Sequence, residues 1–385
     1  VYTWQEPDEK TLSFQREHSA SLRISIIVPA YRTKKEHLEA MLNSVSRQSY
    51  PHWELIVADA GGTAESVQAW AKKNGICLRK AADASNLAEW MDQSIMLCTL
   101  SENKGISANT NAGIELAAGD AVGLLDHDDL LTANALWEMA DCLEKEKKRG
   151  KQKLVLFSDE DKCDGAASRF YEPNFKLDFD GELLLTNNYI CHFTVIETAF
   201  LKELKLRSGF DGAQDYDLML RAYAAGGQFV HVPKVLYHWR CHEASTASNP
   251  QSKRYAYEAG QRALEDYCLR KGWKATVSGL KHLGFYREDY EDSVFCQRPE
   301  IGIWAKPLPG GRDIFGIRHP KGFLVSGLYE NDGSMRYAGL RKGYSGPMHR
   351  AALQQSAPAA DLRSMEVCSA LKERYAQTIA ELKEA

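Results

Sequence analysis

The sequence lacks the features that mark membrane-spanning and exported proteins. No apolar run reaches the roughly 18 to 20 residues that span a bilayer. The opening stretch, VYTWQEPDEK, also lacks the charged start and apolar centre of a signal peptide. These absences predict a cytoplasmic protein, and they leave peripheral contact with the inner face of the plasma membrane open.

The sequence also lacks an excess of basic over acidic residues and closely spaced cysteine pairs. The formal net charge is −4, so the sequence lacks the basic excess typical of nucleic-acid binders, and we expect no nucleic-acid partner. The nine cysteines include no C-x-x-C pair, which argues against both a zinc ribbon and a disulfide framework. We therefore expect reduced thiols.

Two phosphate-binding loops are also missing. Neither G-x-G-x-x-G nor G-x-x-x-x-G-K-[ST] occurs in the sequence, which disfavours dinucleotide oxidoreductases and P-loop NTPases. Any nucleotide would have to be held through a metal ion and side chains.

What is present is an alternation of apolar runs and helical patterns. RISIIVPA (23–30), WELIVADAGG (53–62), DAVGLLD (120–126) and KLVLFSDED (153–161) are typical of buried strands, and helical spacing separates them at 35–47, 105–118 and 132–148. The βαβ alternation predicts an α/β protein with a mainly parallel sheet flanked by helices.

The remaining segments give weaker signals. Residues 83–100 look like an irregular insertion, 228–232 and 235–240 like two strands, and 251–271 like a long helix. We interpret 272–300 as a linker, 301–350 as a small β-rich module and 361–383 as a closing helix. That helix carries an apolar stripe that must be buried on its own module or on a partner chain: Leu371, Tyr375, Ile379 and Leu382.

Carboxylates follow three of the predicted strands, at Asp59, at 126–129 and at 159–161. Ligands bind at the carboxyl ends of strands in open α/β sheets, so these side chains are candidates for a binding site. Each has a structural alternative as a helix cap or turn residue, and Asp129 in particular could cap a helix that begins near Thr132.

The group Asp126-His127-Asp128-Asp129 is harder to explain structurally. Three carboxylates this close repel one another unless protons or a cation offset their charge. Oxygen ligands suit Mg²⁺ or Mn²⁺, so the sequence predicts a divalent cation here.

Several motifs in order resemble glycosyltransferase family 2. They are RISIIVPAYRT, WELIVADA, ENKGISANTNAGIELAAGDAVGLLDHDDLL, FSDEDK, NNYICHFTVI, GAQDYDLMLRA and VLYHWRCHEASTA. The sequence is most similar to bacterial rhamnosyltransferase-like enzymes that build O-antigen and capsular polysaccharides. The resemblance implies a GT-A fold, a UDP-, dTDP- or GDP-sugar donor, a divalent Mn²⁺ or Mg²⁺ cofactor, and inversion at the anomeric carbon.

The resemblance also implies roles in donor binding. The first strand and its proline loop would lie against the nucleobase, the second-strand aspartate would bind the base, and the lysine of the N-x-G loop would approach the diphosphate. Asp126 would bind the ribose, and Arg240 would either offset diphosphate charge or pair with a carboxylate. The implied donor-binding residues are Pro29, Ala30, Tyr31, Asp59, Asn103, Lys104, Asp126 and Arg240.

For the metal, the resemblance implies Asp128, with Asp129 as an alternative ligand and His238 completing the set. The roles of the three aspartates could permute, and a histidine at position 238 could equally be a hydrogen-bonded core residue. For the base that takes the acceptor proton, the resemblance implies Asp215, beside Gln214 where a glutamate is common. Asp217 points to another side of the same helix and is assigned a structural role.

Two further groups keep two interpretations. The run Asp159-Glu160-Asp161 either lines the donor sugar pocket or forms a solvated acidic turn. Aromatic residues near the strand ends either stack on acceptor sugars or belong to the core. These are Phe170, Tyr171, Tyr189 and Trp239.

The predicted organisation is an N-terminal extension (1–20), a GT-A catalytic domain (21–280) and an accessory module (281–385) that resembles part of a second glycosyltransferase domain. The expected function is metal-dependent inverting transfer of a sugar to a saccharide or lipid-linked acceptor in cell-surface polysaccharide synthesis. A nucleotidyltransferase and a catalytically silent glycan-binding or scaffold protein are the alternatives. A homo-oligomer is left open.

Overall fold

The computed structural model describes residues 2–83, 90–241, 254–279 and 283–290, together with four later strands. The chain divides into two compact units, residues 1–178 with 190–253 and residues 179–189 with 254–385. The predicted limits of 20 and 280 do not coincide with this division, and the predicted domains stay a prediction.

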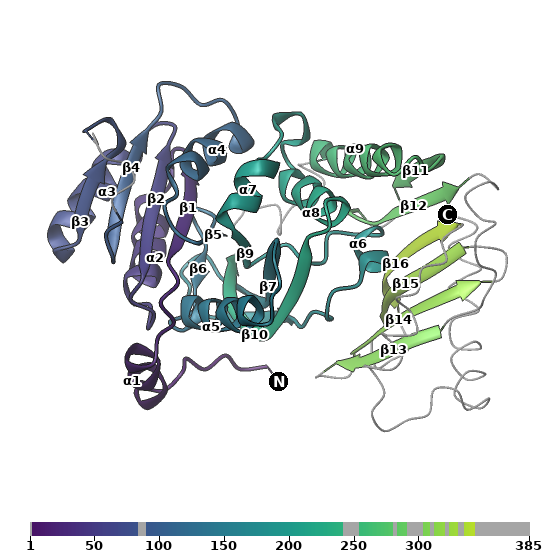
Figure 1. Ribbon diagram of the computed structural model, residues 1–385, viewed down its shortest axis with the longest axis horizontal. Coiled ribbons are helices and arrows are strands. Elements are labelled where there is room, and N and C mark those ends of the chain that lie inside the picture. The colour runs from purple at the N-terminus through teal and green to yellow at the C-terminus, as the bar shows by residue number, and fades with distance from the viewer. Residues whose placement is uncertain are drawn as a thin grey trace. The chain divides into compact units, whose positions relative to one another are not determined.

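The first unit is built on a mixed sheet whose first half is parallel (Figure 1). Its strand order is β3-β4-β2-β1-β5-β9-β7-β10-β6, and the first five strands all run in one direction. The parallel strands are β1 (Ile24–Ala30), β2 (Trp53–Asp59), β3 (Cys77–Lys80), β4 (Ser94–Thr99) and β5 (Ala121–Leu124).

The second half of this sheet mixes directions. Strand β9 (Thr194–Glu197) runs antiparallel between β5 and β7 (Leu154–Cys163), so β5 and β7 point the same way. Strand β10 (Gln228–Arg240) is parallel to β7, β6 (Leu130–Leu131) pairs with β10, and β8 (Phe170–Asn174) pairs with β7. The carboxyl ends of β1, β2, β5 and β7 therefore meet at one edge, as predicted.

Helices cover both faces of the sheet, as Figure 1 shows. On one face lie α2 (Lys35–Ser46), α3 (Ala64–Asn74) and α5 (Ala135–Lys148), whose apolar sides join the core. On the other lie α4 (Ile106–Leu116), α7 (Thr198–Leu204) and α8 (Gln214–Ala224). Helix α4 approaches closely because Gly113 has no side chain, and a Cβ there would lie 2.7 Å from Ile27. The predicted α/β class is confirmed.

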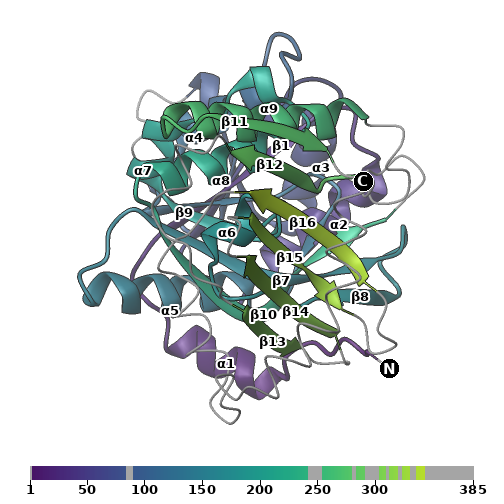
Figure 2. The ribbon, with the colours of Figure 1, turned by 90° about the vertical axis from the view of Figure 1, so that its right-hand side faces the viewer.

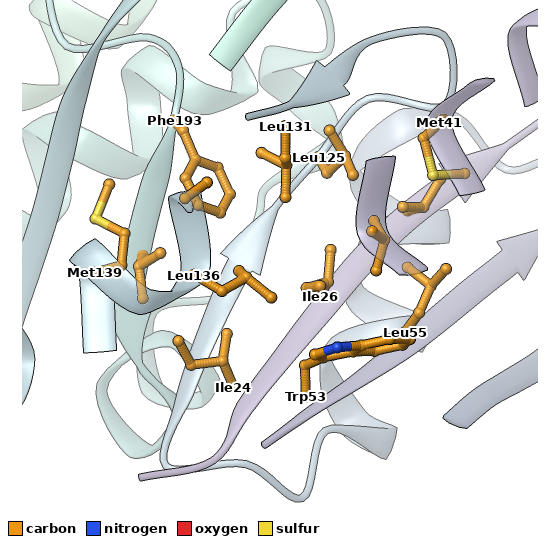
Figure 3. Packing of buried hydrophobic residues seen from close by; sticks show 14 of the residues in the cluster. Ile24, Ile26, Met41, Trp53, Leu55, Leu125, Leu131, Leu136, Met139 and Phe193 are labelled. Carbon is orange, nitrogen blue, oxygen red and sulfur yellow. The ribbon is translucent and has the colours of Figure 1, made fainter. Parts of the chain in front are cut away.

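Alternation along β1 divides its side chains between these faces. Ile24, Ile26 and Val28 belong to one cluster with residues of α2 and α5, while Ile27 faces α4. Figure 3 shows how Ile24 and Ile26 pack with Trp53 and with residues of the helices. Burial of this cluster fixes the register of the parallel strands, and with it the position of the loops at their ends.

The N-terminal segment folds onto the first unit. Helix α1 (Glu9–Glu17) begins at the N-cap Asp8 and buries Gln15, which donates to Glu138 and accepts a hydrogen bond from Ser49. Ahead of it, the Tyr2 hydroxyl donates to Asp161 over 2.7 Å. The arm formed by residues 2–8 thus reaches the central strand β7.

The second unit contains helices α6 (Gly181–Leu184) and α9 (Arg254–Arg270) and a separate sheet that can be followed in Figure 2. The strand order of this sheet is β11-β12-β16-β15-β14-β13. The β-rich character predicted for residues 301–350 is confirmed for the strands that the structure describes. The strands are β11 (Ala275–Gly279), β12 (Tyr286–Tyr290), β13 (Ile303–Leu308), β14 (Arg312–His319), β15 (Phe323–Tyr329) and β16 (Met335–Lys342).

Three predictions about the weaker segments are wrong. The supposed insertion at 83–100 contains strand β4, and the supposed linker at 272–300 contains the antiparallel pair β11 and β12. The strands expected at 228–232 and 235–240 form one strand, β10, with an irregular register between Val232 and Val235. Short turns at η1 (Ala81–Asp83) and η2 (Ser208–Phe210) complete the described elements.

The closing helix predicted at 361–383, with its apolar stripe, lies outside the described residues. Within the described part of the chain, every cysteine is free of a disulfide. None of the helices described there combines the length and apolar character that crossing a membrane requires.

Candidate active site

The acidic loop after β5 is held against strand β10. The Tyr237 hydroxyl donates to Oδ2 of Asp129 over 2.6 Å, and the Arg240 backbone N–H donates to Oδ1 of the same carboxylate over 2.7 Å. Asp129 is 1% exposed. Helix α5 begins at Ala135 with Asn134 as its N-cap, so the alternative that Asp129 caps a helix near Thr132 is wrong.

The Arg240 guanidinium fixes the same loop through its backbone. Its Nε donates to the Asp128 carbonyl over 2.5 Å and its Nη1 to the Gly165 carbonyl over 2.7 Å. Nη2 is buried without a hydrogen-bond partner in the part of the chain that the structure describes. These contacts give Arg240 a loop-holding role, and its predicted contact with a diphosphate stays a prediction.

A cluster of candidate metal ligands forms at this edge of the sheet. Carboxylate oxygens of Asp126 and Asp129 and a ring nitrogen of His192 lie within 4.8 Å of one another. The His192 ring stacks on Tyr237 with centroids 4.7 Å apart, and its edge meets Trp239 at 5.7 Å. We call Asp126, Asp129 and His192 the Asp-Asp-His cluster.

The cluster carries negative charge that the protein offsets only in part. Burial raises the pKa of Asp126, the charges of Asp128 and Asp215 raise it further, and His192 lowers it. Burial, followed by the charges of Asp128 and Asp126, raises the pKa of Asp129 well above its usual range. A cation placed among these groups would relieve that repulsion.

The donor set fits a divalent cation. Carboxylate oxygens suit Mg²⁺ and Mn²⁺, and an imidazole nitrogen is among the commonest metal ligands in proteins. The cluster shares Asp129 with the predicted ligand set and contains Asp126 and His192 where Asp128 and His238 were expected.

His238 lies elsewhere, in an aromatic environment. Its Nδ1 is 2.5 Å from Oδ1 of Asp161, and its ring meets those of Trp4 and Phe170 at 5.0 and 4.3 Å. Its Nε2 is buried without a hydrogen-bond partner among the described residues. This environment favours the core alternative for His238, whereas its role as a metal ligand stays a prediction.

Asp215, the candidate base, lies in the first turn of α8. The Cys191 thiol donates to its Oδ2 over 3.6 Å, and its charge contributes to the raised pKa of Asp126. Asp215 is therefore electrostatically coupled to the Asp-Asp-His cluster. Asp217 instead pairs with Arg207 and with Arg221, the latter at 2.9 Å, so its predicted structural role is confirmed.

Asp59, at the end of β2, binds the backbone of the turn that leads into α3. Its carboxylate accepts hydrogen bonds from the backbone N–H groups of Gly61, Thr63 and Ala64 at 3.0 to 3.2 Å. The N-cap of α3 is Thr63, so the turn alternative describes the contacts of Asp59, and base binding stays a prediction.

The end of β1 lies beside this turn. Ala30 is buried, Pro29 is partly buried and Tyr31 is 39% exposed. A Cβ at Gly61 would lie 3.5 Å from the Tyr31 ring. The structure brings these residues next to the Asp59 turn, and their predicted contact with a nucleobase stays a prediction.

The N-x-G loop is tied to α4 through Asn103. Its Oδ1 accepts hydrogen bonds from the Gly105 backbone and from Asn109. The Lys104 ammonium is 3.1 Å from Glu102, and both side chains are 64% exposed. Lys104 therefore projects into solvent in this structure, and its predicted approach to a diphosphate stays a prediction.

The acidic run of β7 is buried. Asp159, Glu160 and Asp161 are between 0% and 6% exposed, so the solvated-turn alternative is wrong. Each has its own partner: Asp159 bonds His231 at 2.8 Å, Glu160 pairs with Lys176 at 3.4 Å, and Asp161 bonds His238.

The sequence motifs included His192 but gave it no role. Strands β5 and β9 are antiparallel, with Leu124 opposite Thr194. Extending this register by two residues on each strand brings Asp126 beside His192. The signal is thus a strand register, which cannot be read before the pairing of β5 with β9 is known.

Several known proteins are similar in sequence to this chain. Residues 25–204 match the family model described as Glycosyl transferase family 2. The chain is 36% identical to the uncharacterized protein y4gI of Sinorhizobium fredii over 255 residues, which are 66% of this chain and 26% of that protein. It is 33% identical to the O-antigen biosynthesis protein RfbC of Myxococcus xanthus over 256 residues, 66% of this chain and 19% of that protein.

Among solved structures, S. aureus TarS 1-349 in complex with UDP-GlcNAc aligns with a TM-score of 0.48 and 19% identity, over 64% of this chain and 67% of that chain. The chain spans about a quarter of y4gI and about a fifth of RfbC. The family match shows that the chain contains a domain of glycosyltransferase family 2. With the mixed, mainly parallel sheet, it confirms the predicted GT-A class of fold.

Proposed function

We propose that this protein is a metal-dependent, inverting glycosyltransferase that uses a nucleotide-diphosphate sugar. The proposal rests mainly on the Asp-Asp-His cluster, whose ligand atoms lie within 4.8 Å of one another beside the candidate base. A catalytically silent glycan-binding protein would gain nothing from partly uncompensated, buried carboxylates. This observation therefore favours the transferase over that alternative.

In this proposal, Asp126, Asp129 and His192 hold Mn²⁺ or Mg²⁺. When bound, the cation supplies positive charge that stabilises the departing nucleoside diphosphate. Tyr237 and Arg240 keep the loop in place through Asp129. Asp215 accepts the proton of the acceptor hydroxyl as that oxygen attacks the anomeric carbon from the side opposite the leaving group.

The acceptor is proposed to be a saccharide or a lipid-linked saccharide in cell-surface polysaccharide synthesis. Support comes from the family of the domain and from the similarity to a protein named for O-antigen biosynthesis. Arg240 and Lys104 are proposed to contribute positive charge near the diphosphate, and residues 29–31 with Asp59 to contact the nucleobase. The proposed donor is a UDP-, dTDP- or GDP-sugar.

The first experiment is a thermal-stability screen of the purified chain with UDP, GDP and dTDP, each with and without Mn²⁺. A ligand that binds only the folded state raises the melting temperature by mass action. We expect one nucleotide to give a metal-dependent shift, and we expect this shift to be smaller in His192→Ala, which keeps two of the three ligands.

The variant Asp215→Asn separates binding from chemistry. It should keep the metal-dependent shift while kcat falls by about 10²- to 10⁴-fold, the usual contribution of a general base. If no nucleotide shifts the melting temperature with or without Mn²⁺, the metal-nucleotide proposal is overturned and the glycan-binding alternative takes its place.

A further inference from the structure

Lys176 is a buried lysine that the proposed chemistry does not use. Its side chain is 1% exposed, and its ammonium lies 3.4 Å from the Glu160 carboxylate on β7. Removing two charges from water is costly unless hydrogen bonds satisfy both partners. The contacts that satisfy this pair therefore indicate what the pair holds in place.

The pair forms hydrogen bonds with the backbone at and near His192. The Lys176 ammonium donates to the carbonyl of Ile190 over 2.6 Å and also to the carbonyl of His192 itself. Glu160 accepts the His192 backbone N–H at its Oε2 over 3.2 Å. Both polar groups of the His192 backbone are thus bound by one buried ion pair.

The pair is itself anchored to the sheet. The backbone N–H of Lys176 donates to Asp159 over 2.8 Å, and the Asn174 side chain donates to Oε1 of Glu160 over 3.2 Å. Both acceptors belong to β7, which lies between β9 and β10 in the sheet. Through the pair, the position of His192 is tied to a central strand.

We propose that Lys176 and Glu160 are positioning residues that fix the His192 imidazole for metal binding. This inference rests on the proposed function, because it takes the Asp-Asp-His cluster to be a cation site. A metal ligand on an irregular segment needs support around it, and loss of such outer partners typically weakens metal affinity by about 10- to 100-fold. Much of the charge of the pair is satisfied by the backbone at residues 190 and 192, so loss of the pair should act mainly on the position of His192.

The test measures Mn²⁺ binding directly, by electron paramagnetic resonance of free Mn²⁺, in the full chain. In Lys176→Met, which keeps an unbranched apolar side chain but lacks the ammonium, we expect Mn²⁺ affinity to fall by about 10- to 100-fold. Glu160→Gln keeps one acceptor oxygen for the His192 N–H and should give a smaller loss. It also serves as the second variant if Lys176→Met does not fold.

The matched control is Glu54→Gln. Glu54 is 1% exposed, pairs with Arg79 at 3.0 Å and accepts a backbone N–H from Ala118, but it supports no residue of the cluster. This variant should lower the melting temperature and leave Mn²⁺ affinity unchanged. A loss of affinity in Lys176→Met alone would then reflect positioning and not general stability.

A double-mutant cycle with His192→Ala identifies the route of the effect. If the pair acts through His192, Lys176→Met should cause no further loss of Mn²⁺ affinity in the His192→Ala background. An equal loss in both backgrounds, or unchanged affinity in Lys176→Met, would overturn the positioning role while leaving the proposed function standing. Absence of Mn²⁺ binding by the unmodified chain would overturn both.

Discussion

Two acidic strand ends at the same edge of the sheet differ in how their charge is satisfied. Asp59, after β2, receives three backbone N–H groups from the turn and from the start of α3. Asp126 and Asp129, after β5, lie beside Asp128, and burial together with neighbouring carboxylates raises the pKa of each. The charge at the end of β2 is satisfied by backbone hydrogen bonds, whereas neighbouring carboxylates still repel one another at the end of β5.

The difference separates a structural aspartate from a candidate ligand. Both fit the sequence pattern of a carboxylate at the end of a buried strand, but a helix N-terminus supplies donors and partial positive charge to only one of them. Substitutions at the two ends should therefore change stability in opposite directions and activity to very different extents.

The largest effect is expected from Asp126→Asn. Loss of a metal ligand should lower the rate of sugar transfer by more than about 100-fold, because charge on the leaving group is no longer stabilised. The melting temperature without metal should not fall, because the substitution removes a repelling charge. Activity assays and thermal melts test both points, and a strongly destabilised apo variant would contradict our account of the loop.

The pH dependence of the metal-free protein should show the same repulsion. A carboxyl whose pKa is raised above its usual value of 3.8 binds its proton more tightly in the folded state, so it costs stability as pH rises through the raised pKa. The difference in melting temperature, Asp126→Asn minus the unmodified chain, should therefore increase as the pH rises from 3.8 through the raised pKa.

Mn²⁺ affinity should rise with pH together with this repulsion, whereas the stability of the metal-free protein falls. Because the ligands must lose their protons to bind, affinity should weaken as pH falls toward the usual carboxyl range. Titrations with Mn²⁺ at several pH values test this prediction, and an affinity that is independent of pH would contradict it.

Asp59→Ala is expected to lower stability, in contrast to Asp126→Asn, and the effect should be smaller than the loss of activity in Asp126→Asn. Loss of its hydrogen bonds to the turn should lower the free energy of unfolding by about 1 kcal/mol or more, since each such bond typically contributes about that much. Mn²⁺ affinity should stay the same. Denaturant unfolding measures the first quantity, and a change in nucleotide affinity would show that Asp59 also has its predicted role in base binding.

The smallest effect on stability is expected from Lys104→Ala. Its side chain is exposed and its ammonium pairs with Glu102 at the surface, so the free energy of unfolding should change by less than about 0.5 kcal/mol. If Lys104 approaches the diphosphate, KM for the donor should rise at unchanged stability. An unchanged KM would remove Lys104 from the donor site.

The parallel half of the fold was predictable because its signals are local. Strands such as β1 and β2 are continuous apolar runs, and helices such as α2 have clear helical spacing. Strand β4 was missed because SIMLCT follows an irregular stretch and lacks a turn signal at its start. The pair β11 and β12 was missed for a related reason, since neither strand alternates clearly between apolar and polar residues.

The sequence predicts which chain segments contribute to the candidate site, but not which of their residues lie next to each other in space. The sequence identified the acidic loop and Asp215, yet the choice between His192 and His238 depends on which strands are adjacent and in which register. His192 comes next to Asp126 through the antiparallel pairing of β9 with β5, a long-range contact without a local signature. The same limit applies to Lys176, whose importance appears only from the backbone groups that it contacts.

The N-terminal arm has a consequence for the order of events during synthesis. Tyr2 is among the first of these residues to be made, but Asp161, its hydrogen-bond partner, follows 159 positions later. The His238 ring that contacts Trp4 is made later still. Closing so long a loop costs conformational entropy, and the stabilising contacts form only once β7 and β10 are present. The arm therefore docks after these strands have been made. The first unit thus completes its folding with residues that are made before the strands they contact.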